Sequence, residues 1–149
     1  MSTREEVFEF SKMVINTLQL MGFFEGKLPK ISGFDVVFSE GFDLAEKNYA
    51  AAFYVGGEGV PAIVLKKGFS LGEPDDLHCL VHESIHIAQV MKGDYVYSVN
   101  GQVLWKGEIY QSLDGAHPDY FDEYLQPWEF EVKEITPKVI AQLAASIAI

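Results

Sequence analysis

The sequence predicts an α+β fold in one domain, residues 1–149, and three observations lead to this expectation. A chain of 149 residues with 48% hydrophobic and 13% aromatic residues has the length and composition of one globular domain with a substantial core. Segments with helical periodicity occur near both ends and in the middle, and short β-prone segments lie between them. No repeat, low-complexity tract or linker divides the chain.

The first element is a predicted amphipathic helix over residues 3–21. Thr3-Arg4-Glu5-Glu6 predicts a capping box, in which the threonine and the second glutamate satisfy each other's backbone N–H groups. Apolar residues then follow at helical spacing, namely Val7, Phe10, Val14, Leu18 and Met21. Gly22 and Gly26 end the helix. Nothing in this segment indicates catalysis, so we expect it to pack on a sheet.

A small antiparallel or mixed sheet is expected next. Residues 34–38 form a short predicted strand, and residues 49–55 and 61–67 flank the glycine-rich segment 56–59 as a hairpin. No helix beginning with lysine and serine or threonine follows these glycines, which makes them turn residues and not a phosphate loop. The second hairpin strand carries Pro61 and two lysines, and this composition predicts an edge strand.

The central element is a predicted helix from Asp76 to Met91. Asp75-Asp76 offers an N-cap and favourable charge at the helix start, and Gly93 offers a C-terminal stop. Its apolar residues cover most of the circumference, which is typical of a buried helix. They are Leu77, Leu80, Val81, Ile85, Ile87, Ala88 and Met91.

The remainder of the chain predicts a hairpin and a C-terminal helical region. Two β-prone runs in residues 95–105 flank Asn100-Gly101, a strong signal for a tight hairpin turn. Residues 107–120 are polar and irregular, and we expect a loop near the site. Pro127 suits the first turn of a helix, Thr136-Pro137 should interrupt that helix, and residues 137–147 should form a final one.

Charge and composition exclude several classes of partner and location. The net charge is −11, from 11 basic and 22 acidic residues, which argues against binding to nucleic acid or to an anionic membrane. The single cysteine, Cys79, excludes an internal disulfide framework. The first residues lack a signal-peptide pattern, and no apolar run approaches the roughly 18 residues of a membrane span. We therefore expect a soluble, cytoplasmic protein.

The predicted central helix carries the segment His82-Glu83-Ser84-Ile85-His86. Two histidines four residues apart share one helix face, where both imidazoles can bind one zinc ion at about 2.0–2.1 Å. Glu83 is rotated about 100° from His82, so it can reach a metal-bound water as a general base instead of binding the metal. The alternative is that both histidines are core residues hydrogen-bonded to the backbone, with Glu83 at the surface.

A catalytic zinc usually has three protein ligands and an open position for water, so one more ligand is required. His78 and Cys79 lie one turn before His82, although a third ligand normally comes from a separate element. His117 lies in a loop-like Ala-His-Pro segment. Glu129 and Glu131 lie in the helix that begins at Pro127 and remain the other candidates.

Helical periodicity separates the two glutamates. Glu129 shares a face with Val132 and should point toward the core, whereas Glu131 shares its side with Glu134 and Lys138 and should face solvent. The alternative role for both is stabilisation of the helix N-terminus, worth about 0.3–1 kcal/mol.

The combination of His-Glu-x-x-His and a later Glu-x-x-(small residue) resembles the gluzincin group of zinc peptidases. More narrowly, residues 81–89, Trp105-Lys106-Gly107 and residues 124–132 resemble small phage- and prophage-encoded predicted metallopeptidases with the pattern His-Glu-x-x-His, Trp-x-Gly, Leu-Pro-Trp-Glu-x-Glu-Ala. The likeness covers roughly residues 60–135, and departs from the pattern at Gln126 and Val132. It implies a minimal zincin-like domain with zinc as cofactor. The metal ligands it implies are His82, His86 and Glu129, with Glu83 as general base.

These observations predict a zinc-dependent peptidase acting on a peptide or protein substrate through metal-activated water. Tyr124, or alternatively Tyr120, is a candidate donor to the oxyanion. By analogy with zincins, the substrate strand should add to the exposed edge at residues 62–66. The alternative function is a zinc-binding interaction or inhibitory protein on a peptidase scaffold, such as a phage accessory factor, whose acidity suits a basic partner.

Overall fold

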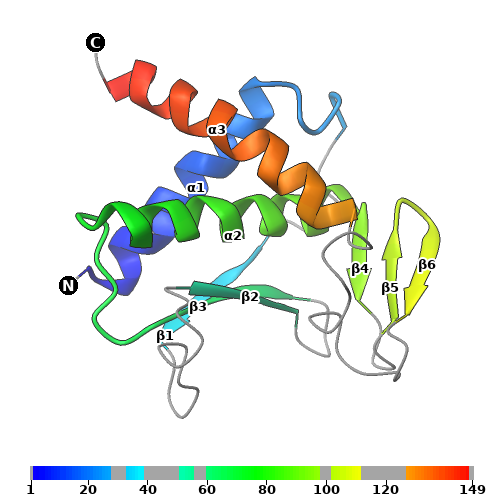
Figure 1. The fold of residues 1–149 in the computed structure, drawn as a ribbon, viewed down its shortest axis with the longest axis horizontal. Coiled ribbons are helices and arrows are strands. Elements are labelled where there is room, and N and C mark those ends of the chain that lie inside the picture. Colours follow the sequence, from blue (N-terminus) through cyan, green and yellow to red (C-terminus); the bar gives the residue numbers. More distant parts are fainter. Residues whose placement is uncertain are drawn as a thin grey trace.

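The computed structural model describes residues 2–27, 33–38, 51–55, 60–97, 102–111 and 127–147. Within these residues the fold is α+β, with three helices and two three-stranded sheets (Figure 1). The elements in chain order are α1 (Arg4–Leu20), β1 (Asp35–Phe38), β2 (Ala51–Val55), β3 (Pro61–Leu65), α2 (Pro74–Lys92), β4 (Tyr95–Tyr97), β5 (Gln102–Trp105), β6 (Glu108–Gln111) and α3 (Pro127–Ile147).

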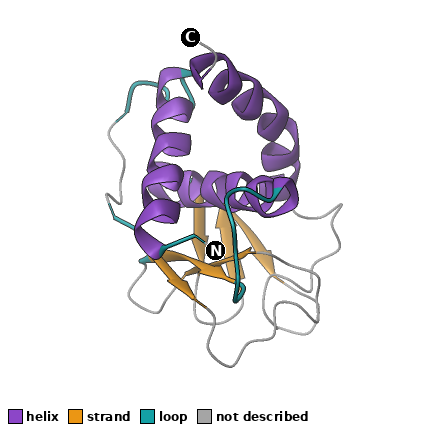
Figure 2. Cartoon of the chain, turned by 90° about the vertical axis from the view of Figure 1, so that its left-hand side faces the viewer, coloured by secondary structure: helices purple, strands orange, loops and turns teal. Residues whose placement is uncertain are grey.

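Helix α2 is the central element of this arrangement. It lies between the first sheet on one side and helices α1 and α3 on the other (Figures 1 and 2). Fully buried apolar side chains from all of these elements form one core. They include Val7, Val14, Leu18, Val36, Ile63, Leu65, Leu80, Ile85, Ile87, Val132 and Val139. None of the described helices combines the length and apolar character that a membrane span requires.

The first sheet has the strand order β1-β3-β2, so β3 is its central strand. β1 pairs with β3 in parallel and β2 pairs with it in antiparallel fashion, which confirms the predicted hairpin. The prediction that residues 61–67 form an edge strand is wrong. Pro61 is the first residue of β3, where a missing N–H is tolerated, and Lys66 and Lys67 follow the strand's end.

The bounds and N-cap of helix α1 agree with the sequence prediction, but it packs mainly on α2 and meets the first sheet chiefly at β1, so the expected packing on a sheet holds only in part. Thr3 is the N-cap, and the reciprocal bonds of its capping box with Glu6 are both present. Where α1 crosses α2, the Ser11 and Ser84 hydroxyls are buried and lie 2.8 Å apart. Ser84 also donates to the Leu80 carbonyl, so Ser11 must donate to Ser84. Two small, mutually satisfied side chains allow the helices to pack closely.

Helix α2 begins two residues before the predicted start. Glu73 is the N-cap without a side-chain cap bond, and Pro74 occupies the first turn, where its missing N–H costs nothing. Asp76 is therefore not the cap. Its buried carboxylate accepts from the Ser70 N–H at 3.0 Å and pairs with Lys66 at 3.0 Å. The C-terminal prediction is confirmed, because Gly93 adopts the left-handed conformation with a φ of 87°.

The second sheet is a meander of β4, β5 and β6. The β4–β5 pairing confirms the predicted hairpin, whose turn at Asn100-Gly101 lies outside the described residues. The prediction of an irregular loop from residue 107 is wrong for residues 108–111, which form β6 against β5. A two-residue turn connects these strands, with Lys106 at φ 49° and Gly107 at φ 86°. Residues 112–120 lie outside the described part of the chain.

Helix α3 is continuous, so the predicted interruption at Thr136-Pro137 is wrong. Pro137 lies inside the helix on its exposed side, where the N–H that proline lacks would otherwise continue the helical hydrogen bonds. Thr136 is buried and donates its hydroxyl to the Val132 carbonyl at 2.6 Å. Burial of the flanking Val132 and Val139 in the core offsets the cost of the proline.

Candidate metal centre

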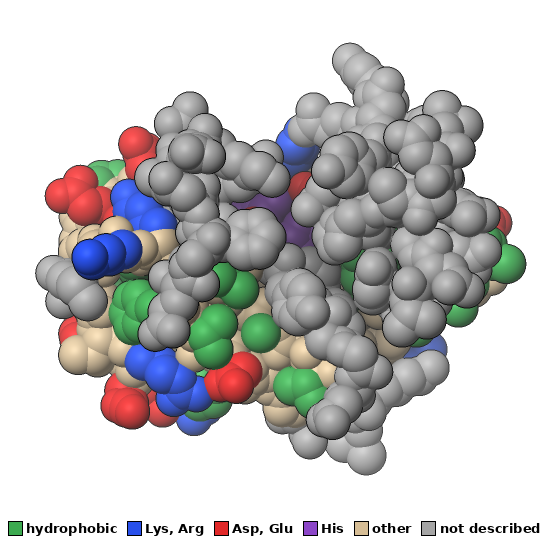
Figure 3. Space-filling view, turned by 90° about the horizontal axis from the view of Figure 1, so that it is seen from below, with side chains coloured by type: hydrophobic (Ala, Val, Ile, Leu, Met, Phe, Trp, Pro, Cys, Tyr) green, Lys and Arg blue, Asp and Glu red, His purple; other side chains and the backbone are tan. Residues whose placement is uncertain are grey.

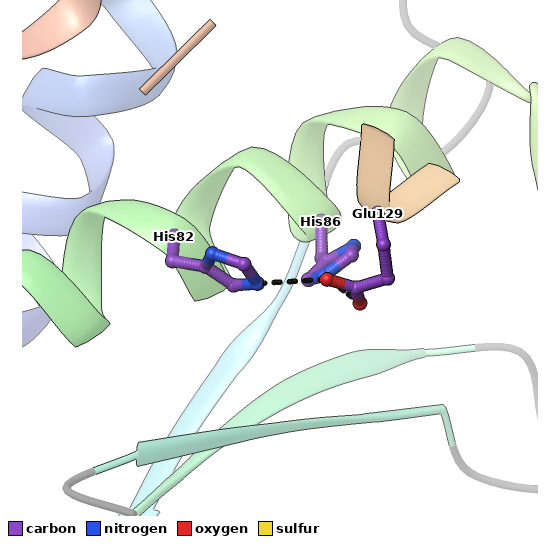
Figure 4. Close-up of side chains that lie close together, drawn as sticks. All are labelled: His82, His86 and Glu129. Atoms are coloured by element: carbon purple, nitrogen blue, oxygen red, sulfur yellow. Dashed lines mark hydrogen bonds and ion pairs between the residues drawn. The ribbon is translucent and has the colours of Figure 1, made fainter. Parts of the chain in front are cut away.

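Helix α2 holds the two histidines of the motif on one face, one turn apart. Their ring centroids are 5.0 Å apart, and both rings point below the helix toward the first sheet (Figure 4). His86 is buried, with its side chain 4% exposed, whereas the His82 side chain is 23% exposed. Histidine is also visible from below in the space-filling view (Figure 3). One ligand position is therefore fixed by the core, and the other lies nearer to solvent.

Glu129, in the first turn of α3, completes the cluster. Its carboxylate oxygens lie 3.1 Å from His82 Nε2 and 2.8 Å from His86 Nε2 (Figure 4). One ligand atom from each of the three residues lies within 4.8 Å of the others. The structure thus brings together the three residues that the sequence predicted as ligands, across 47 positions of sequence between His82 and Glu129.

Aromatic packing places the first turn of α3 over this face of α2. Trp128 is 3% exposed and lies against Tyr95 of β4 and Trp105 of β5, at centroid distances of 5.5 and 6.3 Å. Four residues later along the helix, Val132 is fully buried in the core. Anchors on both sides of Glu129 direct its carboxylate toward the histidines, and the valine at position 132 does not prevent this approach.

The cluster is electrostatically coupled. Burial alone would lower the pKa of His86, but the hydrogen bond and charge of Glu129 outweigh it and raise that pKa to about 9. Burial alone would raise the pKa of Glu129, but hydrogen bonds from His82 and His86 hold it well below its ordinary value. At neutral pH and without metal, a carboxylate and a protonated His86 therefore neutralise each other.

A second group of polar residues contacts Nδ1 of His86, the ring nitrogen that does not face Glu129. The sequence analysis did not predict this group. Gln89 is fully buried, and its carboxamide oxygen lies 2.8 Å from His86 Nδ1. The same carboxamide donates to Glu131 at 3.1 Å, and Lys106 lies 3.9 Å from that glutamate. The prediction that Glu131 faces solvent is therefore wrong, because the approach of α2 and the β5–β6 turn covers it. The sequence did carry one signal for this contact: Gln89 lies one turn after His86 on the same helix, so their side chains can meet.

The other predicted candidates are less closely involved. His78 is exposed on α2 and Cys79 is half-buried, and neither belongs to the three-residue cluster in the described part of the chain. Glu83 is half-buried beside His82, and its negative charge contributes to the raised pKa of His86. His117, Tyr120 and Tyr124 lie outside the described residues, so their roles stay predictions.

The donor set fits zinc. Two imidazole nitrogens and one carboxylate are the ligands of a common catalytic arrangement. Tetrahedral bonds of about 2.0–2.2 Å require ligand atoms roughly 3.3–3.6 Å apart. The two nitrogen–oxygen separations of 3.1 and 2.8 Å are slightly shorter than this. The three ligand atoms lie within 4.8 Å of one another, so small adjustments of the histidine rings and of the Glu129 carboxylate, which is 23% exposed, would accommodate an ion.

Comparisons with known proteins give no relative for this chain: no protein-family model, no curated protein and no solved structure matches it.

Proposed function

We propose that the protein is a zinc-dependent peptidase with a minimal zincin-like domain. The observation that supports this most strongly is the convergence of His82, His86 and Glu129 from two helices, with ligand atoms within 4.8 Å of one another. A divalent cation bound there would lower the pKa of a coordinated water to about 7 and polarise a carbonyl oxygen. His82, His86 and Glu129 would hold the ion.

Glu83 gives the site a hydrolytic function beyond metal binding. It follows His82 on α2 and therefore projects beside the ligand face, while Glu129 supplies the third ligand. A half-buried carboxylate in that position accepts a proton from the attacking water and passes it to the leaving amine. A structural zinc site has no need of this second carboxylate. Tyr124 stays the proposed donor to the oxyanion.

The first sheet supplies a place for the substrate. The proposed edge is β2, because β3 is paired on both sides. Among the described strands, β2 forms a ladder with β3 alone, and it lies beneath α2. Strands of this sheet pass below the histidines (Figure 4). A peptide that adds to β2 as an extended strand would bring one of its carbonyl groups toward the cluster.

The test compares hydrolysis by the zinc-loaded wild-type protein and by Glu83→Gln. We expect the variant to keep one zinc per chain and to lose about 10²–10⁴-fold in the rate of cleavage of a casein-type substrate, because the general base is removed. Glu134→Gln is the matched control, since it makes the same change on the exposed side of α3 and should keep both zinc and activity.

Two results would contradict the proposal. Equal cleavage by the wild type and Glu83→Gln would mean that the activity comes from elsewhere. A wild-type protein that binds zinc tightly but cleaves no peptide would favour the alternative of a zinc-binding interaction protein.

A further inference from the structure

The buried carboxamide of Gln89 has three polar partners, and together they fix its orientation. Its nitrogen, Nε2, lies 2.9 Å from the Trp128 carbonyl oxygen and 3.1 Å from Glu131 Oε1. Its oxygen, Oε1, lies 2.8 Å from His86 Nδ1. The carbonyl and the carboxylate can only accept hydrogen bonds. The reversed amide would bring its oxygen against two other oxygens, so the nitrogen must face them.

This orientation determines which nitrogen of His86 carries a proton. Gln89 Oε1 can only accept, so His86 Nδ1 must donate. In a neutral imidazole the lone pair is then on Nε2. That atom is the one that faces Glu129 Oε1 at 2.8 Å and belongs to the metal cluster.

We infer that Gln89 is a positioning residue that holds His86 in the tautomer and ring orientation required for binding metal through Nε2, and that Glu131 keeps Gln89 in place. This inference rests on the metal centre of the proposed function, but not on peptide hydrolysis. Hydrogen bonds from outside the ligand shell of this kind typically contribute 10–100-fold to metal affinity.

The network also connects the second sheet to the site. Lys106, in the turn between β5 and β6, lies 3.9 Å from Glu131 Oε2, while Glu131 Oε1 accepts from Gln89. Trp128 contributes its carbonyl to Gln89 and its ring to the packing against β4 and β5. The elements that bring Glu129 to the histidines thus also orient Gln89.

The experiment measures zinc affinity by chelator competition in Gln89→Leu, which has a similar volume but no acceptor for the His86 N–H. We expect affinity to fall 10–100-fold. We also expect ¹⁵N NMR of the zinc-loaded protein to lose the hydrogen-bonded Nδ1–H signal of His86. Gln142→Leu, the same change at an exposed position of α3, should alter neither.

A double variant tests whether restoring an acceptor for the His86 Nδ1–H also restores zinc affinity. Gln89→Glu combined with Glu131→Gln exchanges the carboxylate and the carboxamide, so an acceptor still faces His86 Nδ1 and a donor at position 131 still faces residue 89. The Trp128 carbonyl loses its donor and meets a carboxylate oxygen instead, so the restoration is expected to be partial. The double variant should regain part of the lost affinity and the Nδ1–H signal. If Gln89→Leu does not fold, Gln89→Met, which is unbranched like glutamine, repeats the measurement.

The inference is overturned if the leucine or methionine variant binds zinc as tightly as the wild type with an unchanged His86 Nδ1–H signal. That result would leave the proposed peptidase intact. Conversely, a wild type that cleaves no peptide but shows the expected loss of zinc affinity in Gln89→Leu would contradict the peptidase and support the positioning role.

Discussion

Zinc binding should depend strongly on pH, because the metal must displace a proton from His86. Glu129 raises the pKa of His86 to about 9, so at pH 7 the metal-free site holds a proton on the nitrogen that would bind the ion. The pKa of Glu129 is lowered, so this carboxylate releases no proton at pH 7. Proton competition at His86 should therefore weaken zinc binding at neutral pH and disappear as pH rises through about 9.

The size of the change in zinc affinity follows from the difference between pH 7 and the pKa of His86, which is about 9. Two pH units below a pKa of about 9, only about 1% of His86 is neutral, and at pH 9 half of it is. Apparent zinc affinity should therefore rise about 50-fold between pH 7 and pH 9 from this group alone. Competition with a chromophoric chelator at constant ionic strength measures the change, and calorimetry in two buffers of different ionisation enthalpy counts the released proton.

Glu129→Gln is the control for this prediction. The hydrogen bond and charge of Glu129 are the largest contributions that raise the pKa of His86, and burial lowers it, so removing the carboxylate charge should lower this pKa and leave more of the imidazole neutral at pH 7. The variant should bind zinc more weakly than the wild type, and its zinc affinity should depend less on pH. Any ionisation of metal-bound water should affect both proteins similarly, so the comparison isolates the proton on His86. A wild-type dependence no steeper than that of the variant would refute the proposed coupling.

Three further predictions concern stability. Pro137→Ala should raise the free energy of unfolding by about 1–3 kcal/mol in urea titrations, because it restores a helical hydrogen bond at an exposed position of α3; an unchanged or lower value would contradict this. Thr3→Ala should lower it by about 0.5–2 kcal/mol through loss of the capping box, whereas an effect within error would mean that the box contributes nothing. Chelated protein should keep its circular dichroism spectrum, because the ligands hydrogen-bond one another without metal; unfolding on chelation would instead indicate a structural ion.

The features that could be predicted from sequence are those that local interactions determine. The capping box at Thr3 and the left-handed Gly93 depend on residues within one turn of each helix end. The pairing of His82 and His86 depends on helical spacing alone. Glu129 was placed correctly because the same periodicity puts it on the side of the buried Val132.

The features that were missed depend on contacts between residues distant in sequence, or on a backbone conformation that is unfavourable for its residue type but is present in the fold. β3 is central because β1 pairs with it across the chain, and no property of residues 61–67 reveals this partner. β6 was missed because Lys106 adopts a left-handed conformation that its residue type does not favour. Glu131 is covered only because Gln89 and the β5–β6 turn approach it, which helical periodicity cannot indicate.

The most direct test of the central claim is the zinc content and X-ray absorption spectrum of the wild type beside Glu129→Ala. We predict one zinc per wild-type chain, bound by two imidazole nitrogens and a carboxylate. In the variant the carboxylate contribution should be lost, and affinity should fall by more than the roughly 10–100-fold expected for an outer hydrogen bond. A wild type that binds no zinc, or a variant with an unchanged ligand shell and affinity, would contradict the account.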